Sequence, residues 1–338
     1  MKDGKFITLA FETSCDETSV ALVADGREAL SNVVSSQIEV HKAFGGVVPE
    51  IASRHHLDNM SSVYNKAMED AGVSLQEVDL IGVTCGPGLV GALLIGLATA
   101  KAFAYATKKP LVGVHHIQGH ICANYIEHED LEPPFLALVV SGGHTHLINV
   151  KGYNEHTVLG KTRDDAAGEA FDKVARVLGL GYPGGPAIDS VAREGNPHSV
   201  EFKRAMLEKD SLDFSFSGLK TGVLNYLNTQ KLKGQKINVP DVAAAFQLAV
   251  VDVLVAKAMM AAERTGHNKL VLAGGVAANS LLRSMLSEAC EKAGITLYYP
   301  SLKLCADNAA MIACAAYYKY LDGLTDDMTL DAYPALSL

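Results

Sequence analysis

Two histidines spaced four residues apart give the strongest chemical signal in the chain. Residues 114–121 read VHHIQGHI, so His116 and His120 are separated by about one helical turn. On a helix this spacing puts both imidazoles on one face, at the separation that a metal ion needs, whereas His115 points elsewhere. The pair predicts a metal site, although such pairs also occur as plain polar or capping histidines.

A carboxylate is needed to complete such a site, and the segment SLKLCADNAAM at 301–311 offers Asp307 at the start of an expected helix. Two histidines and one carboxylate with open positions suit Fe(II), or zinc in a substrate-binding role. The HxxxH spacing also resembles the HExxH motif of zinc proteases. Ile117 occupies the position where that motif needs its glutamate base, so the protease interpretation lacks a mechanism.

Two segments of a second kind, one in each half of the chain, predict anion-binding turns. They are FITLAFETSCDETSVALVAD at 6–25 and FLALVVSGGHTHLINV at 135–150. Each has an apolar strand, a tight turn rich in Ser, Thr, Gly or Asp, and a second strand, a geometry that points N–H groups and hydroxyls at an anion. Two such phosphate turns indicate a nucleotide held between two related lobes.

A glycine pair near the C-terminus adds to this pattern. In GGVAANSLLRSML at 274–286, Gly274 and Gly275 end a strand, and Asn279 stands at the start of a helix. The glycines let the backbone approach a nucleotide, although a plain turn with Asn279 as helix cap explains the motif alone. With the two phosphate turns it predicts an α/β, two-lobed actin/Hsp70/sugar-kinase-like (ASKHA) fold with duplicated ribonuclease-H-like domains.

The order of the expected elements supports a duplication. The first half predicts a strand pair at 6–24, a strand at 30–36, a helix at 50–72, a strand at 79–88, a helix at 90–107 and a strand at 110–115. The second half predicts strands at 135–150 and 156–160, a helix at 168–179, helical structure over 198–265, a strand at 269–275, and helices at 278–294 and 307–320. We expect an N-terminal lobe of residues 1–116, joined by a C-terminal helix at about 321–338, and a C-terminal lobe of residues 117–320.

Composition sets the class of protein. The chain has 338 residues, is 49% hydrophobic and has a net charge of −9, so general attraction to polyanions is not expected. The six cysteines form no CxxC pair, which favours reduced thiols and a cytoplasmic location. The chain begins directly with an expected strand, with no leader pattern. The apolar run near 89–106 contains Gly91, Gly96 and Lys101, which favours a core helix over a membrane span.

Nine motifs together resemble one family along nearly the whole chain. They are FETSCDETSVALV, HKAFGGVVPEIASRHH, TCGPGLVGALLIGLATAKAFA, KPLVGVHHIQGHICA, VVSGGHTHL, DDAAGEAFDKVARVLGLGYPGGPAID, FSFSGLKT, GGVAANSLLR and LCADNAAM. In this order they are similar to the bacterial tRNA N6-adenosine threonylcarbamoyltransferase (TsaD) family, formerly called O-sialoglycoprotein endopeptidases or glycoproteases. Gln118 is a glutamate in some members, but it is not a metal ligand.

The resemblance implies an activity. A threonylcarbamoyl group would pass from threonylcarbamoyl-AMP to N6 of adenosine 37 in tRNAs reading ANN codons, forming t6A and releasing AMP. It also implies site residues. One Fe(II) per subunit, with zinc possible in vitro, would bind to His116, His120 and Asp307. The second phosphate turn would be lined by Val139, Val140, Ser141, Gly142 and Gly143, and the ribose and base of the adenylate would be held by Asp172, Gly185, Asp189 and Asn279.

Several of these residues have simpler interpretations. Asp172 could be an i, i+4 partner of Arg176, Gly185 could belong to a plain turn, and Asp189 could cap a following helix. Adenine N6 is a poor nucleophile, so a carboxylate that accepts its proton would help. Asp16 and Glu17 in the first turn are the candidate catalytic bases, and turn formation is the alternative.

Recognition of tRNA is the least visible function. The chain has no Trp and no run of basic residues, and its best positive charges are scattered: Lys161, Arg163, Lys173, Arg176, Lys203, Arg204 and Lys220. Partner proteins are therefore expected to supply part of the RNA surface, and the resemblance implies the paralogous subunit TsaB and the small ATPase TsaE. An ATP-hydrolysing kinase or chaperone-like ATPase on the same fold is the alternative enzyme class.

Overall fold

The computed structural model describes residues 4–205, 208 and 210–338, and these form two compact units. Unit 1 consists of the chain up to Pro133, Gly152–His156 and Pro300–Leu338, and unit 2 consists of Pro134–Lys151 and Thr157–Tyr299. The expected lobes, 1–116 with 321–338 and 117–320, stay a prediction. The compact units differ from them in assigning residues 117–133 and 300–320 to unit 1.

Unit 1 is built on a five-stranded sheet of order β3-β2-β1-β4-β5. Its strands are β1 (Ile7–Glu12), β2 (Glu17–Ala24), β3 (Glu28–Ser36), β4 (Leu80–Gly86) and β5 (Leu111–His115). The first three strands pair antiparallel, whereas β4 and β5 run parallel to β1. Every residue of β1 and β4 is buried, which is typical of central strands covered on both faces.

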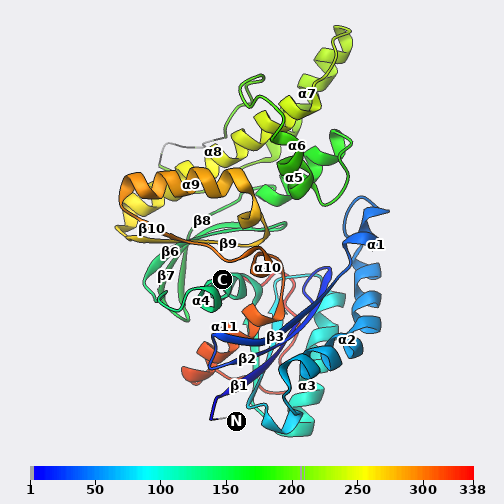
Figure 1. Cartoon of the computed structure of the whole chain (residues 1–338), viewed down its shortest axis with the longest axis vertical. Helices are drawn as coiled ribbons and strands as arrows, with labels where there is room; N and C mark the ends of the chain where they lie inside the picture. Colours follow the sequence, from blue (N-terminus) through cyan, green and yellow to red (C-terminus); the bar gives the residue numbers. More distant parts are fainter. Residues whose placement is uncertain (1–3, 206–207, 209) are drawn as a thin grey trace. The chain divides into compact units, whose positions relative to one another are not determined.

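Helices cover this sheet on both faces. Figure 1 shows α2 (Pro49–Ala71) and α3 (Val90–Thr107) on one face, and α4 (His116–Glu127) and α11 (Ala309–Leu321) on the other. Short helical segments complete the unit: α1 (Ile38–Lys42), η1 (Leu75–Glu77) and α10 (Leu302–Cys305). Because α11 packs against α4 and the sheet, the last helix of the chain lies beside the histidine helix.

Unit 2 repeats the same plan. Its strands are β6 (Phe135–Val140), β7 (Thr145–Gly152), β8 (Glu155–Lys161), β9 (Lys269–Ala273) and β10 (Thr296–Tyr298). Their order is β10-β9-β6-β7-β8, so the first strand of the unit is central here as in unit 1, with an antiparallel hairpin on one side and parallel strands on the other. The shared strand order confirms the expected duplication of a ribonuclease-H-like unit.

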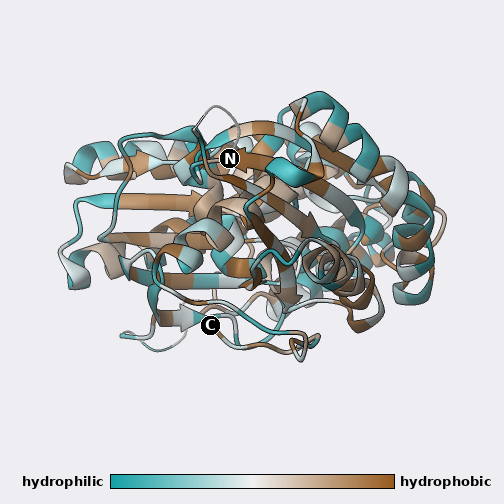
Figure 2. Ribbon diagram, turned by 90° about the horizontal axis from the view of Figure 1, so that it is seen from below, coloured by the Kyte–Doolittle hydropathy of each residue, from teal (hydrophilic) through white to brown (hydrophobic). Residues whose placement is uncertain are grey.

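The helices of unit 2 are α5 (Ala167–Val177), α6 (Gly184–Ala192), α7 (Ser217–Leu232), α8 (Val239–Thr265), η2 (Gly275–Ala278) and α9 (Ser280–Ala293). In α8 most side chains are buried, so it is the core helix of the unit. Brown, hydrophobic ribbon runs along the strands in Figure 2, while teal, hydrophilic stretches mark the outer helices. By length and composition α3 and α8 could each cross a membrane, but the core helix of a soluble protein meets the same test.

Three expectations differ from the structure. The helical stretch predicted over 198–265 is wrong in its first part, since the described residues of 198–216 contain no helix. The structure adds α6, which begins at Gly184 although its Pro-Gly-Gly sequence favours a turn. The predicted C-terminal helix at about 321–338 is also wrong, because α11 ends at Leu321.

Beyond α11 the chain lies extended against unit 1. The N–H of Asp326 donates to the carbonyl of Leu111 at 2.8 Å, and the N–H of Tyr333 donates to the carbonyl of Cys85 at 2.7 Å. Leu330 is buried against Gly113. These contacts satisfy backbone groups that a surface segment of this kind would otherwise leave to water.

Candidate metal and nucleotide sites

The two spaced histidines lie on the first turns of α4, which follows β5 without a loop. His115 caps this helix, because its Nδ1 accepts the N–H of Ile117 at 3.2 Å while its Nε2 donates to the carbonyl of Leu336 at 3.3 Å. His115 therefore points away from the pair, as the spacing predicts. The rings of His116 and His120 are 4.6 Å apart between centroids and both side chains are buried.

Asp307 is held in place by the capped start of α11. The N-cap Asn308 accepts the N–H of Met311 at 3.1 Å. The two N–H groups before it are bound by side chains of the sheet. Ser19 Oγ accepts from the N–H of Ala309 at 2.9 Å, and Asn32 Oδ1 accepts from the N–H of Ala310. These three caps satisfy the first N–H groups of the helix and thereby fix the backbone next to Asp307.

The three predicted ligands converge. Oδ1 of Asp307 lies 3.4 Å from Nε2 of His116 and 3.2 Å from Nε2 of His120, and the three ligand atoms all lie within 4.8 Å of one another. Within residues 4–205, 208 and 210–338 this is the one group of His, Cys, Asp and Glu side chains with such spacing.

His120 supplies a test of whether these residues fit a metal. Neither of its ring nitrogens has a partner with hydrogen-bond geometry, although the side chain is fully buried and Nε2 is close to Asp307. A buried polar atom without a partner is costly, and a metal ion would satisfy Nε2. The donor set, its burial and this orphaned nitrogen all fit a bound metal.

A buried carboxylate lies behind His116. Oε2 of Glu12 is 3.2 Å from Nδ1 of His116 and accepts the hydroxyl of Thr84 at 2.5 Å, while Oε1 accepts the N–H of Ser14 at 2.5 Å. Burial alone would raise the pKa of Glu12, but the charge and hydrogen bond of His116 outweigh it and lower the pKa. Conversely, burial would lower the pKa of His116, but Asp307 and Glu12 hold it well above its usual value.

The candidate bases Asp16 and Glu17 lie in the turn after β1 and at the start of β2. Burial raises the pKa of Glu17 well above its usual value, and the charges of Asp16 and Asp307 raise it further. Ser36 donates a hydrogen bond to Glu17 at 3.0 Å. Glu17 is therefore a carboxyl that its surroundings favour in the protonated form, and the charge of Asp307 reaches it.

His56 from α2 fixes the same turn. Its Nε2 donates to the carbonyl of Cys15 at 2.9 Å and its Nδ1 accepts from the hydroxyl of Thr18 at 2.8 Å. Burial lowers the pKa of His56, which favours the neutral ring that this pattern of hydrogen bonds requires. Both ring nitrogens of His56 are thus engaged in hydrogen bonds that hold the turn.

The glycines that open α3 support this turn from the other side. The N–H of Leu89 donates to the carbonyl of Ser14 at 2.8 Å, and Thr13 Oγ1 donates to the carbonyl of Ala92 at 2.8 Å. A Cβ at Gly96 would lie 2.5 Å from Thr13 Oγ1, and one at Gly88 would lie 2.5 Å from the carbonyl oxygen of Ser14. These glycines permit close packing of α3 on the turn.

In unit 2, the predicted second phosphate turn joins β6 to β7. Val139 and Val140 are buried inside β6, so the turn itself begins at Ser141, whose N–H donates to the carbonyl of His144 at 2.8 Å. Gly142 and Gly143 are exposed, and a Cβ at either would meet nothing within 4 Å. The turn therefore presents open backbone, as an anion-binding loop requires.

Asp172 and Gly185 are neighbours in space. Asp172 is on α5, where its Oδ1 accepts the N–H of Gly184 at 2.7 Å and so joins α5 to the first turn of α6. Gly185 follows with open space around its Cα. Asp189 lies inside α6 rather than at a helix cap, and its Oδ1 accepts both the N–H and the hydroxyl of Ser280, at 3.2 and 2.7 Å.

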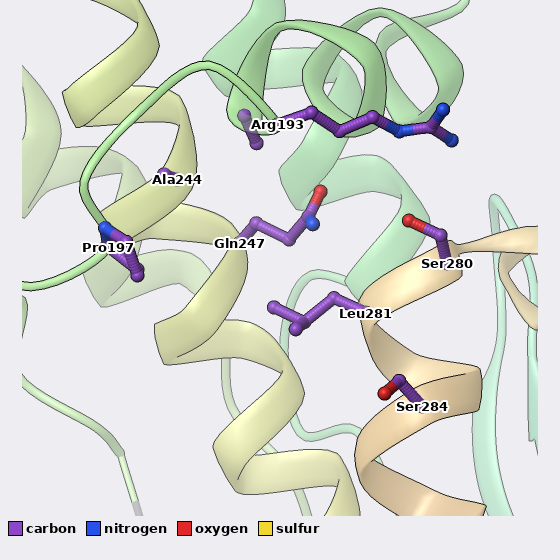
Figure 3. A pocket seen from close by; sticks show the side chains of 8 residues that line it. Arg193, Pro197, Ala244, Gln247, Ser280, Leu281 and Ser284 are labelled. Atoms are coloured by element: carbon purple, nitrogen blue, oxygen red, sulfur yellow. The ribbon is translucent and has the colours of Figure 1, made fainter.

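Asp189 and Asn279 contact two residues, Ser280 and Gln247, that line a pocket of about 270 Å³ (Figure 3). Asn279 is the N-cap of α9, accepting the N–H of Leu282 at 2.9 Å, and its Nδ2 donates to Gln247 Oε1 at 3.3 Å. The pocket is lined by Ala192, Arg193, Pro197, Ala244, Gln247, Ser280, Leu281 and Ser284. An apolar wall with a few amides and hydroxyls is a surface suited to a flat heterocycle.

Sequence reasoning missed Glu12 at the first site and Gln247 and Arg193 at the second. Glu12 stands in the first turn motif, but its partner His116 is 104 residues further on. Gln247 is a single buried amide within the apolar helix α8, which is the signal that could have marked it.

Comparison with known proteins gives one consistent family. The family model described as "TsaD: tRNA N6-adenosine threonylcarbamoyltransferase" matches residues 28–314. A relative of the same name from Clostridioides difficile (strain 630) is 58% identical over 332 residues, covering 98% of each chain. Another from Clostridium beijerinckii is 58% identical over 334 residues, covering 99% of this chain and 98% of the relative.

Solved structures agree on the fold. HypF of T. kodakarensis matches with a TM-score of 0.65 at 15% identity, over 94% of this chain and 48% of that chain. Component A of the Acidaminococcus fermentans (R)-2-hydroxyglutaryl-CoA dehydratase matches with a TM-score of 0.55 at 14% identity, over 94% of this chain and 98% of that chain. The predicted actin/Hsp70/sugar-kinase-like fold is confirmed at this level.

Proposed function

The chain belongs to the tRNA N6-adenosine threonylcarbamoyltransferase family, and we propose that His116, His120 and Asp307 hold the metal ion at which it transfers the threonylcarbamoyl group. The chain is a tRNA-modifying transferase that forms t6A. The observation on which the metal assignment depends most is the buried imidazole of His120, whose Nε2 lies 3.2 Å from Asp307 without hydrogen-bond geometry.

We assign Fe(II) to this site, with zinc as a substitute in vitro. Two imidazoles and one carboxylate leave coordination positions open, which suits iron more than a closed structural zinc site. When bound, the metal would act as a Lewis acid on donor oxygens and stabilise the charge that leaves with AMP. The protein's own contribution is the fixed geometry of the three ligands.

Glu12 positions one of these ligands. A carboxylate facing Nδ1 of His116 retains the proton on that nitrogen and leaves the lone pair of Nε2 directed toward Asp307. This carboxylate–histidine arrangement is common behind metal sites, where it orients the ring and raises its basicity. Thr84 and the backbone of Ser14 in turn fix the carboxylate of Glu12.

We propose that the donor is threonylcarbamoyl-AMP and that unit 2 binds its adenylate part. The open turn at Ser141–Gly143 would take the phosphate, Asp172 and Gly185 would face the ribose, and the pocket beside Asp189 and Asn279 would take the base. Each of these contacts is chemically ordinary. Backbone N–H groups bind an anion, a carboxylate accepts hydrogen bonds from hydroxyls, and a mostly apolar wall with an amide suits adenine.

The acceptor is N6 of adenosine, which we place at position 37 of tRNAs reading ANN codons. Its attack on the carbamate carbon needs a group that accepts the N6 proton. We propose the Asp16–Glu17 pair, because burial and the neighbouring charges raise the pKa of Glu17 and so make its carboxylate a stronger base.

We further propose that the chain works in the cytoplasm with the partners TsaB and TsaE. An apolar stripe on the outer face of α3 supports docking of a protein subunit, because Val90 and Leu94 are exposed one turn apart and are followed by Ala98 and Ala102. Such a stripe of large and small apolar residues packs well against a helix of similar kind.

The experiment that tests this function follows radiolabelled threonylcarbamoyl from its adenylate to unmodified tRNA. It compares wild type, His116→Ala and Glu155→Gln, the last an exposed residue of β8 that serves as control. We expect metal-dependent label on tRNA with wild type and control, and none with His116→Ala. ATP hydrolysis without transfer in wild type, with all partners present, would instead favour the kinase or ATPase class.

A further inference from the structure

A basic hairpin connects α7 to α8. Residues 214–240 contain Lys220, Lys231, Lys233 and Lys236 but no Asp or Glu, in a chain whose net charge is −9. The last three lysines lie within six residues at the end of α7, and residues 231–236 are all exposed. We call residues 228–238 the lysine hairpin. Its charge is inconspicuous in the sequence because the lysines alternate with other residues.

The lysine hairpin projects from unit 2. Only Leu219 and Val223 of α7 are buried, and both lie in its first two turns. Tyr226 still packs against Phe202, with ring centroids 6.2 Å apart, but the last turn of α7 is open and Leu232 is 90% exposed. Figure 1 shows the end of α7 extending beyond the other helices of its unit.

The turn of the hairpin has a defined backbone. Gly234 adopts φ of +64°, a left-handed conformation that ends the helix, and its N–H donates to the carbonyl of Lys231 at 3.1 Å. The N–H of Gln235 donates back to the carbonyl of Gln230 at 3.0 Å. This pattern is typical of a helix C-terminus closed by glycine, so the three lysines are presented on a fixed scaffold.

The lysines of the hairpin differ from the cations that the sequence favoured for RNA binding. Arg163 is paired with Asp213 at 2.9 Å, Lys173 with Asp165 at 2.6 Å and Arg204 with Asp252 at 2.7 Å. In the part of the chain that the structure describes, the ammonium groups of Lys231, Lys233 and Lys236 take part in no ion pair. Their charge is therefore available to a polyanion.

We propose that the lysine hairpin binds the phosphate backbone of the tRNA substrate. The inference rests on the proposed function, because it assigns a contact for the RNA on which that site acts. Lysine is a point charge that suits phosphates, and a tip without aromatic side chains has nothing to stack on bases. The contact is therefore expected to raise the affinity for tRNA and to position it, without recognising its base sequence.

Two alternative roles for these lysines fit the geometry less well. Lysines at a helix C-terminus stabilise the helix dipole, but Lys236 lies beyond the turn and gains nothing from it. An acidic protein partner would also meet the charge. Protein interfaces are, however, depleted in lysine at their core, and the hairpin offers only Leu232 and the partly exposed Ile237 as apolar anchors.

The test is the salt dependence of binding between the full chain, with its partners, and an unmodified tRNA transcript. The variant is K231Q/K233Q/K236Q. The control is Lys292→Gln, because Lys292 is also in the last turn of a helix and is 78% exposed, but lies 3.7 Å from Glu288. Thermal unfolding checks that both variants fold as wild type does.

Each phosphate neutralised contributes about 0.7–0.9 to the slope of log Kd against log salt, so three lysines account for roughly 2–3. We expect the triple variant to lose about this much of the slope and to bind tRNA on the order of tenfold more weakly at 50 mM salt. The KM for tRNA should rise while kcat at saturating tRNA stays the same. Lys292→Gln should match wild type in every measurement.

An unchanged slope in the triple variant would overturn the inference. So would weaker assembly with the partner subunits at unchanged tRNA affinity, which would assign the hairpin to an acidic protein surface. The proposed function fails separately, by the absence of label transfer in wild type. His116→Ala distinguishes the two, since it should lose transfer but retain the full salt slope of tRNA binding.

Discussion

Nδ1 of His116 lies 3.2 Å from Oε2 of Glu12, so a strand of the sheet sets the orientation of a ring on a helix. Glu12 is the last residue of β1 and His116 the first of α4, and both side chains are buried. The contact ties the metal site to the central strand of unit 1, which is the part of the unit least able to move.

Replacing Glu12 by Gln should weaken metal binding without removing a ligand. An amide accepts a weaker hydrogen bond than a carboxylate, so it holds the Nδ1 proton and the orientation of the His116 ring less firmly. Loss of such a partner behind a metal ligand typically lowers metal affinity by about 10–100-fold. The measurement is competition with a chelator, followed by metal analysis of the protein. Thr84→Val, which removes one hydrogen bond to Glu12, should have a smaller effect in the same direction. Wild-type affinity in both variants would contradict the positioning role.

Replacing His120 by Leu should stabilise the protein without metal. The substitution removes a buried imidazole whose contact with Asp307, 3.2 Å from Nε2, lacks hydrogen-bond geometry, and we expect the free energy of unfolding to rise by about 1–3 kcal/mol. Addition of metal should stabilise wild type but not this variant. Chemical unfolding with and without metal measures both effects.

His56→Leu is the matched control for that experiment. Both nitrogens of His56 have partners, so the same change should lower the free energy of unfolding by about 1–3 kcal/mol. If both leucine variants destabilised the metal-free protein equally, His120 would be an ordinary core residue.

Stability should fall as pH decreases from about 6.5 to about 4, partly because of His146 of unit 2 and His156 of unit 1. Burial lowers the pKa of His146 and of His156 to about 4, and a nearby Lys161 adds to the shift at His146. Each is neutral in the folded chain in this window, whereas the unfolded chain binds a proton there. Stability is therefore fully present above about 6.5 and is lost as pH falls, by up to about 1.4 kcal/mol per pH unit for each histidine.

His146→Gln should flatten that dependence between pH 6.5 and 4.5, because glutamine does not titrate. Urea unfolding at intervals of half a pH unit gives the slope, with the exposed His198→Gln as control. A slope as steep in His146→Gln as in wild type would show that other groups cause the loss.

Two glycines of α3 should respond differently to alanine. At Gly96 the added Cβ would meet Thr13 Oγ1 at 2.5 Å, and this hydroxyl is buried and bonded to Ala92, so it cannot turn away. We expect a loss of about 1–3 kcal/mol from overpacking. At Gly91 the added Cβ would meet Ser53 Oγ at the same distance, but this side chain is only half-buried and can rotate.

Gly91→Ala should therefore be neutral or gain up to about 1 kcal/mol of helix propensity. Thermal unfolding of the isolated chain compares the two variants. Equal losses of stability at both positions would mean that Thr13 yields to the added methyl group as easily as the half-buried Ser53 does.

The strands and the histidine pair were predictable because both depend on local pattern. Alternating and continuous apolar runs define the strands, and a spacing of four on a helix needs no knowledge of the rest of the fold. The contact between Glu12 and His116 could not be predicted, since only the sheet brings these distant residues together. Helix α6 was missed because Pro183, Gly184 and Gly185 favour a turn, and its packing on α8 overrides that preference.

Charge was predicted least well. The cations chosen from the sequence included Arg163, Lys173 and Arg204, which tertiary contacts pair with carboxylates. The lysine hairpin was missed although its residues are contiguous in the sequence. Its exposure and its lack of acidic neighbours depend on how the end of α7 projects from unit 2, which the sequence does not show. Net charge therefore says little about where an acidic protein can meet RNA.

During synthesis on the ribosome, unit 1 cannot be completed until α11 has been made. Its residues cover one face of the sheet formed by β1, β2 and β4, and Asp307 stands just before it. His116 and His120 are made long before that helix emerges, whereas unit 2 lies mostly in one stretch, from Thr157 to Tyr299. A truncated chain can therefore contain most of unit 2 and both histidines but no complete ligand set. With the proposed ligand set, a product that ends before Asp307 cannot form the metal site.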